Sequence, residues 1–563
     1  MNDRAWMISP PLPEAEVLAR ELGLPLPLAR VLSNRGLTNP QEGDRFLHGT
    51  IDDLRDPLLL SGMNEAVARI RQALERREKI LIFGDYDADG VLSVVMLLRA
   101  LQSLGADVDY FIPARLKDGY GLKADHVEVV RKKEARLVIS VDCGIKAEGF
   151  VLKAQELGVD VIITDHHLPG PELPPAAAIL DPVLDDSGYP DKNLAGVGVV
   201  FKLLEALLAG GPHKAGLEHY LKLVSIGTIA DVAELRGENR IFVKHGLKGL
   251  ENPANVGLKS LLDVCGLKGQ RISPGEVAFR IGPRLNAAGR MDSADLAVRL
   301  FLTGSADEAQ DIVRRLDELN RLRQKTEEKI CGQALDKIQA DGLDKSYKIL
   351  VLGSEKWHRG VVGIVASRLK EAFHRPVILF SYEDSLAYGS GRSIKEFSLI
   401  GCLDSLREYF LNYGGHRLAV GCSLPRDRMK PFKEAVNGLA DGQLTAEDLK
   451  RKVRIDAPLD LADIDTEFLR AYSWLEPFGV GNATPVFMTA DAEVASAPQK
   501  LQGRHCKFLA KQNGRTIEAI GWDKGRWADS VGRGSRLSLA YSIQYSNYLG
   551  ETRPYLSLED IRP

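Results

Sequence analysis

The sequence lacks the long apolar runs that cross a membrane. In its 563 residues no stretch of about 18 apolar residues runs without a charge, and the longest candidate, residues 194–208, contains Lys202 and Glu205. The N-terminus lacks a basic region followed by an apolar core, so a secretory signal is not indicated. These absences exclude a membrane span, and we expect a cytoplasmic protein with no membrane partner.

Cysteine is scarce, and neither positive nor negative charge dominates. The six cysteines are scattered without a CxxC pair, which argues against a zinc site or a disulfide framework. The 74 Lys and Arg nearly balance the 77 Asp and Glu, for a net charge of -3. The distribution is uneven, however. Residues 456–493 carry eight acids and one base (net -7), whereas residues 500–536 carry nine bases and three acids (net +6). A balanced chain can therefore hide a basic module.

Short apolar runs alternate with helical stretches through the first half of the chain. Residues 1–60 are rich in Pro and Leu and predict a small helical cap. Runs rich in β-branched residues follow at 79–83, 108–112, 137–141, 159–163 and 177–180. Such runs predict an α/β domain over 61–300, built on a parallel sheet covered on both faces.

The second half predicts a connector, a smaller α/β domain and a β-barrel. Residues 305–340 read as one long helix with a capping box formed by Ser305 and Glu308, inside a connector over 301–345. Apolar runs at 348–352 and 376–380 predict the smaller domain, over 346–445. Two strand-like runs flank Asn513-Gly514, which favours a type I′ hairpin, and residues 446–563 are expected to form the barrel.

Acidic residues follow several predicted strands at the end where ligands bind in an open parallel sheet. They occur in Gly84-Asp85-Tyr86-Asp87-Ala88-Asp89-Gly90, in Asp142-Cys143-Gly144, in Asp165-His166-His167, in Asp181-Pro182 and, after a helical segment, at Asp231. Converging carboxylates repel one another unless cations lie between them. Asp and His ligands suit Mn²⁺ or Mg²⁺, and two such ions can promote hydrolysis of a phosphodiester.

A structural role competes with the metal hypothesis for each residue taken alone. A single Asp after a strand is usually a turn or helix-cap residue, and Asp181 is left in that class. A Ca²⁺ loop is the alternative for the triple aspartate, but the sequence that follows lacks the Glu expected near the twelfth position. Three carboxylates within five residues exceed what a turn requires, and the combined pattern favours a metal centre.

The Asp165-His166-His167 motif, with the acidic residues before and after it, resembles the DHH phosphoesterase superfamily. Other stretches are similar to successive motifs of its RecJ exonuclease branch, and the match spans residues 45–563. They are residues 279–291 (FRIGPRLNAAGRM), 357–368 (WHRGVVGIVASR), 389–393 (GSGRS), 414–416 (GGH) and 476–482 (EPFGVGN). The resemblance implies a DHH catalytic domain, a DHHA1 substrate-binding domain and a C-terminal OB-fold that binds nucleic acid.

The resemblance also implies an activity, 5′→3′ degradation of single-stranded DNA to 5′ mononucleotides in recombination and repair. The attacking water would be activated by two Mn²⁺ or Mg²⁺ ions. Single-strand-binding protein and a RecQ-like helicase are the implied partners. Asp87 and Asp89, with Asp85 as a weaker third, would bind metal, Asp142 would bridge the ions, and His166 and Asp231 would complete the set. Asp165 would orient a histidine, and His167 would face the scissile phosphate.

The expected substrate contacts lie mainly in the second domain. Glycines in residues 389–393 allow a phosphate to approach the backbone, while neighbouring polar side chains bind it, and a 5′-phosphate anchor here would explain the polarity of the reaction. Structural salt bridges are the alternative for the arginines, and packing is favoured for Trp357. The candidate residues are Arg115, Arg284, Asn286, Arg290, His358, Ser390, Gly391, Arg392, Ser393 and His416.

The barrel fits a module that binds single strands through cationic grooves and aromatic rings. Half or more of its aromatic residues are expected to belong to the core. The candidate rings are Phe508, Trp522, Trp527, Tyr541, Tyr545 and Tyr548.

Two other functions compete with the exonuclease. A DHH phosphodiesterase acting on short oligonucleotides or dinucleotides would need only the catalytic core and its partner domain, whereas the extra basic barrel favours a long substrate. A replication scaffold without catalysis is the other alternative, but such relatives have lost metal ligands that this chain retains.

Overall fold

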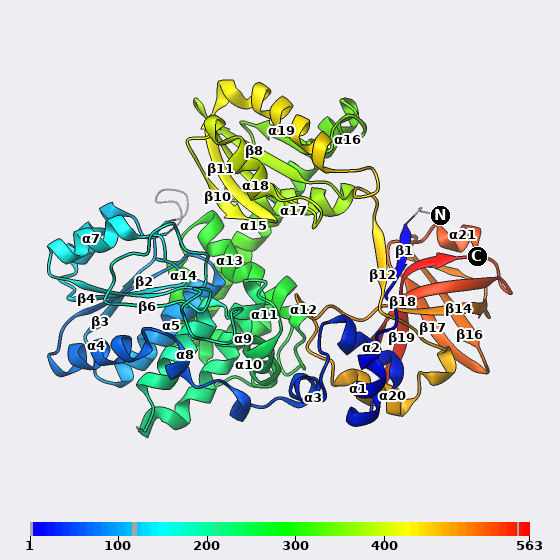
Figure 1. Cartoon of the computed structure of the whole chain (residues 1–563), viewed down its shortest axis with the longest axis horizontal. Coiled ribbons are helices and arrows are strands. Elements are labelled where there is room, and N and C mark those ends of the chain that lie inside the picture. The colour runs from blue at the N-terminus through cyan, green and yellow to red at the C-terminus, as the bar shows by residue number, and fades with distance from the viewer. Residues whose placement is uncertain (1–3, 115–120, 211, 549–550) are drawn as a thin grey trace. The chain divides into compact units, whose positions relative to one another are not determined.

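The computed structural model describes residues 4–114, 121–210, 212–548 and 551–563. These residues form two compact units, each built from segments distant in the sequence (Figure 1). The catalytic unit comprises residues 55–233 and 245–450, and the barrel unit comprises residues 1–54, 234–244 and 451–563.

A five-stranded parallel sheet forms the first part of the catalytic unit and confirms the predicted α/β fold. Its strand order is β3-β2-β4-β5-β6, and every neighbouring pair is parallel. The strands are β2 (Ile80–Gly84), β3 (Val108–Phe111), β4 (Leu137–Val141), β5 (Asp160–Thr164) and β6 (Ala178–Leu180). Strands β2 and β4 are buried along their whole length, as the continuous apolar runs predicted. The carboxyl ends of all five strands therefore meet along one edge.

Helices cover both faces of this sheet (Figure 1). Side chains of α6 and α7 share a core with residues of β2, β4 and β5, including Phe83 and Phe150. Helices α4, α5 and α8 contact the sheet, and α8 also contacts the other two helices. Their bounds are α4 (Met63–Glu75), α5 (Ala88–Ser103), α6 (Val127–Lys132), α7 (Glu148–Glu156) and α8 (Gly196–Leu207).

A helical region links this sheet to the second part of the unit. Its longest helix is α15 (Ala306–Ala340), which confirms the predicted connector helix. Ser305 accepts a hydrogen bond from Glu308 N, but only this half of the predicted capping box forms, because the Glu308 carboxylate binds Thr303 and Arg299 instead. The other helices are α9 (Leu221–Ala230), α10 (Gly237–Lys248), α11 (Val256–Val264), α12 (Pro274–Glu276), the π-helix η5 (Val277–Ile281), α13 (Gly282–Met291) and α14 (Asp295–Leu302).

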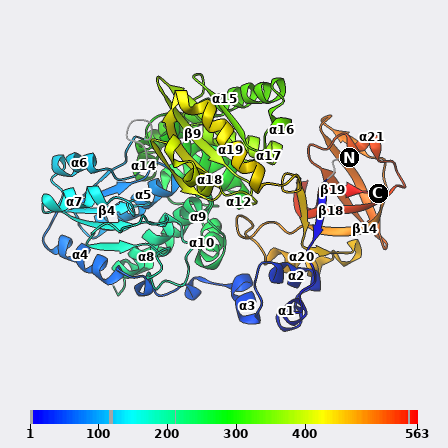
Figure 2. The same cartoon turned by 45° about the horizontal axis from the view of Figure 1, so that its top comes forward.

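A mixed sheet of order β10-β11-β9-β8-β7 forms the second part of the catalytic unit. Strand β9 of this sheet is labelled in Figure 2. Side chains of α18 and α19 share one core with this sheet, and side chains of α17 and the end of α15 share another. The elements are α16 (Leu343–Ser346), β7 (Leu350–Ser354), α17 (Val362–Phe373), β8 (Val377–Glu383), β9 (Leu386–Arg392), α18 (Leu399–Ser405), β10 (Asn412–His416), β11 (Ala419–Pro425) and α19 (Met429–Gln443).

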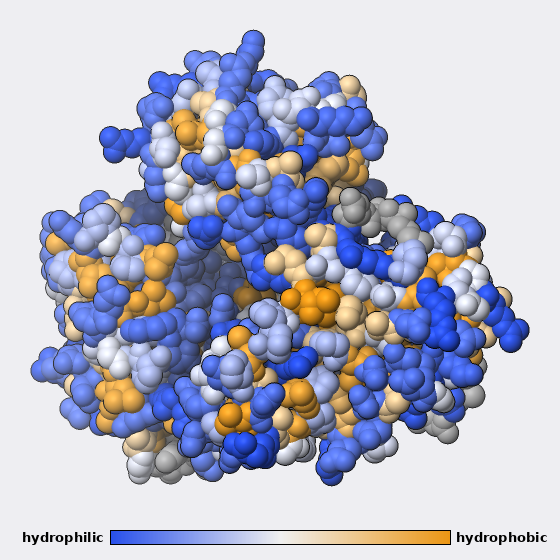
Figure 3. Space-filling view, turned by 45° about the vertical axis from the view of Figure 1, so that its right-hand side comes forward, coloured by the Kyte–Doolittle hydropathy of each residue, from blue (hydrophilic) through white to orange (hydrophobic). Residues whose placement is uncertain are grey.

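Within the described ranges, no helix is long and apolar enough to cross a membrane. Figure 3 shows a face of the molecule on which hydrophilic residues predominate and hydrophobic residues occur in small groups.

The barrel unit contains a closed barrel of five strands, which confirms the predicted C-terminal β-barrel. Strand β14 pairs with β16 and β18, and the circuit continues through β17 and β19. Asn513 and Gly514 have φ angles of 47° and 80°, as the predicted hairpin between β16 and β17 requires. The elements are β12 (Lys452–Ile455), β13 (Ala457–Pro458), α20 (Thr466–Ser473), β14 (Phe487–Val494), β15 (Gln499–Leu501), β16 (His505–Gln512), β17 (Arg515–Gly521), α21 (Trp527–Ser530), β18 (Arg536–Tyr548) and β19 (Glu551–Arg562).

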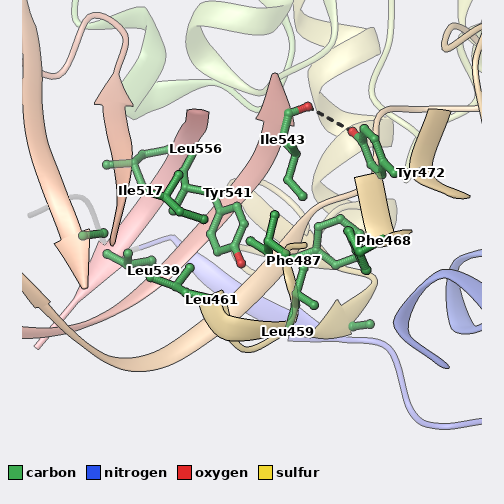
Figure 4. Close-up of a cluster of buried hydrophobic side chains, with 14 of the residues drawn as sticks. Leu459, Leu461, Phe468, Tyr472, Phe487, Ile517, Leu539, Tyr541, Ile543 and Leu556 are labelled. Atoms are coloured by element: carbon green, nitrogen blue, oxygen red, sulfur yellow. Dashed lines mark hydrogen bonds between the residues drawn. The ribbon is translucent and has the colours of Figure 1, made fainter. Parts of the chain in front are cut away.

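The N-terminal helices share the core of this barrel. Leu28 and Leu32 belong to the same buried cluster as Phe468, Phe487 and Tyr541, and Figure 4 shows the barrel side of that cluster. Strand β1 (Ala5–Ile8) also pairs in parallel with β12. The predicted cap is therefore joined to the barrel by shared apolar burial. Its helices are α1 (Glu14–Leu22), α2 (Leu26–Asn34) and α3 (Pro40–His48).

A buried arginine explains the sequence Glu476-Pro-Phe-Gly-Val-Gly-Asn482. The Arg240 guanidinium lies 3.8 Å from the centre of the Phe46 ring and donates hydrogen bonds to the carbonyls of residues 46, 474, 475, 476 and 477. The Asn482 side chain donates to two of these carbonyl groups, those of residues 475 and 477. Burial lowers the pKa of Arg240 to about 9. The loop thus compensates a desolvated cation with backbone oxygens.

Candidate metal centre and substrate site

The predicted acidic residues converge at the carboxyl edge of the parallel sheet. Asp85, Asp87 and Asp89 follow β2, Asp142 follows β4, and Asp231 follows α9. We call the acidic group Asp85, Asp87, Asp89, Asp142 and Asp231, together with His166, the metal crest. Asp85, Asp89 and Asp142 are almost completely buried. Because buried carboxylates are costly without compensation, this arrangement favours a bound cation.

Local backbone geometry fixes the carboxylates of the crest. Asp87 caps α5 by accepting hydrogen bonds from the N–H groups of Asp89 and Gly90. Asp89 in turn accepts from Gly196 N and Val197 N, both at 2.8 Å, at the start of α8. Helix N-termini therefore hold two carboxylates in place.

His166 lies at the centre of the crest. Its Nε2 atom is 3.0 Å from Asp142 Oδ1 and 3.9 Å from both Asp89 Oδ2 and Asp231 Oδ2. In each of three overlapping groups the candidate ligand atoms lie within 4.8 Å of one another, and His166 and Asp142 each belong to two of the groups. These groups are Asp142, His166 and His167; Asp89, His166 and Asp231; and Asp85, Asp87 and Asp142.

The electrostatics of the crest also favour a cation. Burial raises the pKa of Asp89 to about 6, and burial and the neighbouring carboxylates raise the pKa of Asp142 well above its usual value. Burial likewise raises the pKa of Asp231. Burial opposes ionisation of His166, but the hydrogen bond with Asp142 and the nearby Asp231 raise its pKa overall. The raised pKa values of these carboxyl groups mean that their surroundings stabilise the ionised form poorly, whereas a bound cation would stabilise it.

Asp165 orients His167, whereas the sequence resemblance implied that Asp165 would orient a metal-bound histidine. Asp165 Oδ1 lies 2.7 Å from His167 Nδ1, and the same oxygen accepts from His166 N and His167 N. Burial would raise the pKa of Asp165, but its hydrogen bond with His167 lowers it below the usual value. His416, from β10, lies close enough to His167 and Lys146 that, after burial, their charges lower its pKa further. The second part of the unit thus brings His416 toward the catalytic motif.

Ser390 and Arg392 face the first turn of α17. A Cβ atom added to Gly363 in that turn would lie 2.7 Å from Ser390 Oγ and 3.4 Å from Arg392 Nη2. We call Ser390, Arg392 and the first turn of α17 the phosphate anchor. A helix N-terminus beside a guanidinium and a hydroxyl suits a phosphate group. His358, half-buried before this helix, accepts a hydrogen bond from Gly360 N, and burial lowers its pKa.

Several predicted substrate residues instead have structural partners. Arg284 pairs with Asp317 of α15 at 2.9 Å, which favours the salt-bridge alternative. Asn286 accepts a hydrogen bond from Ala88 N. Ser393 is buried and donates to Phe397 O, so it does not join the phosphate anchor.

Two further candidates, Gly391 and Trp357, are buried. Gly391 is buried in the sheet, where an added Cβ would lie 2.7 Å from Val420 Cγ2. Trp357 is buried and belongs to the apolar core between α15, α17 and the sheet, as the packing alternative predicted. Arg115 lies outside the described residues.

The barrel aromatics divide between core and surface. Phe508, Trp527 and Tyr541 are buried, whereas Trp522 and Tyr545 are 45% and 38% exposed. Trp522 makes an edge contact with His505, with ring centres 4.8 Å apart. The side chain of Tyr548 lies outside the described part of the chain. Exposed Trp522 and Tyr545 are therefore the candidates for base stacking.

Sequence reasoning missed the small residues and backbone groups that support the crest. A Cβ atom on Gly196 would lie 2.9 Å from Asp142, and the amides of Gly196 and Val197 bind Asp89. The only sequence signal for this contact is the pair of glycines in Gly196-Val-Gly198 at the start of an apolar helix. One sequence does not reveal which distant strand end such a turn approaches.

Three domain families match the chain in the order of the structure. They are the DHH family N-terminal domain (residues 79–228), the DHHA1 domain (residues 344–441) and the RecJ OB domain (residues 455–560). The parallel sheet, its acidic edge and these matches place the chain in the DHH class.

Comparison over the whole chain gives a narrower assignment. The single-stranded-DNA-specific exonuclease RecJ of Bacillus subtilis is 36% identical over 99% of this chain and 70% of its own length. Crystal structures of RecJ from Thermus thermophilus match in full. The complex with Mn²⁺ has a TM-score of 0.84 and 33% identity, and the complex with Mg²⁺ has a TM-score of 0.78 and 31% identity. They cover 100% of this chain and 80% and 79% of their own. The chain belongs to the RecJ family.

Proposed function

We propose that this protein is an exonuclease that degrades single-stranded DNA from the 5′ end to mononucleotides. The observation that carries the proposal is the metal crest, which gathers five aspartates and a histidine in the compact unit that also contains the phosphate anchor. Curated relatives over almost the full chain are named single-stranded-DNA-specific exonucleases, and this supports the long substrate over dinucleotides.

Two divalent cations, Mn²⁺ or Mg²⁺, fit the residues of the crest. Carboxylate oxygens and a neutral imidazole suit these ions, and buried Asp142 and Asp89 need positive charge nearby. Asp142 would be shared between the two positions, since its carboxylate belongs to two candidate ligand groups, and His166 would bind one of the ions through Nε2. When bound, the ions would activate water and stabilise charge on the phosphate oxygens.

Residues of the chain itself orient the reacting groups. Asp165 holds the Nδ1 side of His167, which makes Nε2 the ring atom that would meet the phosphodiester. We propose that His167 and His416 contact the phosphate oxygens from the two sheets. The two rings are near enough that the charge of His167 lowers the pKa of His416. A positioned hydrogen-bond donor is most effective where charge develops during the reaction.

The phosphate anchor would determine the polarity of the reaction. Arg392 and Ser390 can bind a terminal 5′-phosphate together with the N-terminal amides of α17. A terminal phosphate offers an additional charge and no continuing strand, so an enclosed anchor favours an end over an internal position. The barrel would bind the strand through Trp522 and its basic residues.

The test uses one single strand of DNA labelled at its 5′ end and the same strand labelled at its 3′ end. Each is incubated with Mn²⁺ or with a chelator, beside a duplex control. We expect rapid release of labelled mononucleotide from the 5′-labelled single strand only, and none with the chelator. Release from the 3′ end first would contradict the polarity, and equal release with the chelator would contradict the metal crest. Absence of release from both ends would reject the exonuclease.

Helper proteins and cellular location stay predictions. The family resemblance alone implies single-strand-binding protein and a RecQ-like helicase as partners. The cytoplasmic location is expected from the sequence alone. Co-purification with each candidate partner, with and without DNA, would test the first expectation.

A further inference from the structure

Helix α13 contacts three parts of the catalytic unit that the proposed reaction uses. It follows the π-helix η5 and ten residues later ends at Met291. Its first turn is tied to the connector helix, because Arg284 pairs with Asp317 of α15 and also donates to Arg280 O. Arg284 therefore fixes the start of α13, which leaves the rest of the helix to act on other elements.

The middle of α13 lies against the loop that carries the first aspartates of the crest. Asn286 Oδ1 accepts a hydrogen bond of 2.7 Å from Ala88 N, the residue between Asp87 and Asp89. One turn later, a Cβ atom on Gly289 would lie 2.3 Å from Tyr86 O. Real Cβ atoms do not approach a carbonyl so closely, so a side chain at position 289 would displace the loop. Helix α13 thus fixes the aspartate loop at two adjacent points.

The end of α13 contacts the turn that precedes the phosphate anchor. Arg290 Nη1 donates to Gly360 O at 3.3 Å, and a Cβ atom on Gly360 would lie 2.8 Å from Arg290 O. Gly360 is two residues before the start of α17, whose first turn belongs to the anchor. One rigid helix of ten residues therefore connects the aspartate loop to the anchor.

We propose that α13 is a strut that sets the distance between the metal crest and the phosphate anchor, and thereby the length of the released product. This inference rests on the proposed function. If the 5′-phosphate is held at α17, the phosphodiester that is cut is the one that reaches the crest, and a fixed distance selects one bond. Asn286, Gly289 and Arg290 are positioning residues in this scheme.

The decisive variant is Gly289→Ala, with Gly332→Ala as its matched control. Both glycines lie inside helices, but a methyl group at position 332 meets no atom within 4 Å. Mn²⁺ binding is measured without DNA by the electron paramagnetic resonance signal of free Mn²⁺. Products from a 5′-phosphorylated single strand are resolved by mass spectrometry. We expect Gly289→Ala to weaken Mn²⁺ binding about tenfold, as changes beside metal ligands do, and to release dinucleotides along with mononucleotides. Gly332→Ala should match the unmodified protein in both measurements.

Asn286 provides an independent test if Gly289→Ala does not fold, which thermal unfolding would reveal. Asn286→Ala removes the acceptor for Ala88 N, whereas Asn286→Asp keeps an acceptor oxygen at the same position. We expect the Ala variant to broaden the product lengths and the Asp variant to restore mononucleotides. The strut would be overturned if Gly289→Ala and Asn286→Ala fold, bind Mn²⁺ as tightly as the unmodified protein and release only mononucleotides. If the unmodified protein releases no nucleotide at all, the proposed function fails, while the Mn²⁺ titration still decides whether α13 supports the crest.

Discussion

The two sheets of the catalytic unit carry candidate binding sites that differ in the sign and burial of their charge. The metal crest lies at the carboxyl edge of a parallel sheet and concentrates buried carboxylates whose pKa values are raised. The phosphate anchor lies on the mixed sheet and combines a half-buried guanidinium with a helix N-terminus. One site is suited to cations and the other to an anion. A metal-dependent phosphodiesterase needs both, and the comparison predicts that loss of each site affects a different step.

The largest effect is expected from Asp142→Ala, because this carboxylate is shared by two candidate ligand groups. Hydrolysis should fall by about 10³-fold or more, as expected when the electrostatic stabilisation of a reaction is removed. The folded structure should persist, since removal of a buried carboxylate with a raised pKa relieves a desolvation cost. The measurement is the initial rate with saturating Mn²⁺, together with the unfolding temperature of the metal-free protein. A variant that retains a tenth of the activity would place the metal elsewhere.

Arg392→Ala should produce an intermediate effect, confined to one class of substrate. A hydrogen bond to a charged phosphate contributes about 1.5–3 kcal/mol, so KM should rise about 10- to 100-fold for strands with a 5′-phosphate. The rate on strands with a 5′-hydroxyl should change little. Arg392→Lys keeps the charge but not the planar donor group. Its KM for strands with a 5′-phosphate should lie between those of the unmodified protein and Arg392→Ala. An equal loss on both substrates would assign Arg392 to the fold instead of the anchor.

The difference between the two sites also explains what could be predicted from the sequence. The crest was predictable because all of its residues except Asp231, which follows α9, come within five residues of the end of a buried apolar strand, and the carboxyl ends of parallel strands share one edge. Arg284 and Asn286 were assigned to the substrate because sequence shows their chemistry but not their partners, Asp317 and Ala88. Those contacts join residues far apart in the chain and depend on how α13 packs.

The barrel unit shows the same limit at the level of whole elements. The Pro- and Leu-rich composition of residues 1–60 predicted a helical cap, but nothing in the sequence indicated that Leu28 and Leu32 share a core with Phe487. Nor did it indicate that Arg240, on a helix of the first half, is enclosed by the carbonyls of residues 474–477. A truncation that removes residues 451–563 would therefore expose the apolar faces of α1–α3. A point substitution on the barrel surface is the better test of its role.

Trp522→Ala is expected to weaken binding of single strands by about fivefold, the lower end of the stacking energy of one base, because its ring is partly occupied by His505. The rate of a single cleavage with saturating DNA should be unchanged, since the crest is intact. Leu157→Ala, which removes an exposed apolar side chain from the catalytic unit, is the matched control and should leave binding unchanged. Fluorescence anisotropy with a labelled oligonucleotide measures the difference. Wild-type affinity in Trp522→Ala would remove this ring from the DNA path.

The smallest effect is expected at Asp181, an acidic residue at the same sheet edge that serves a turn. Its Oδ1 accepts a hydrogen bond from Val183 N, in agreement with the turn role that the sequence favoured. Burial raises its pKa to about 7, and the nearby Asp165 carboxylate adds to this shift. The unfolded chain ionises this carboxyl near pH 4, so between about pH 4 and 7 the folded state holds a proton that the unfolded state has lost. Asp181 therefore lowers stability as the pH rises through this range.

Asp181→Asn keeps the acceptor for Val183 N and removes the ionisation, which gives the prediction a definite sign. The variant should match the unmodified protein in stability near pH 4.5 and exceed it by about 1–2 kcal/mol at pH 8, part of the value that the full pKa shift would give. Urea unfolding of the metal-free proteins at both pH values measures the difference. A gap that is constant or shrinks with pH would mean that the Asp181 carboxylate is compensated in the folded protein. The metal crest would then need a cation because its carboxylates repel one another. A single buried carboxylate at the same sheet edge, such as Asp181, would not need one.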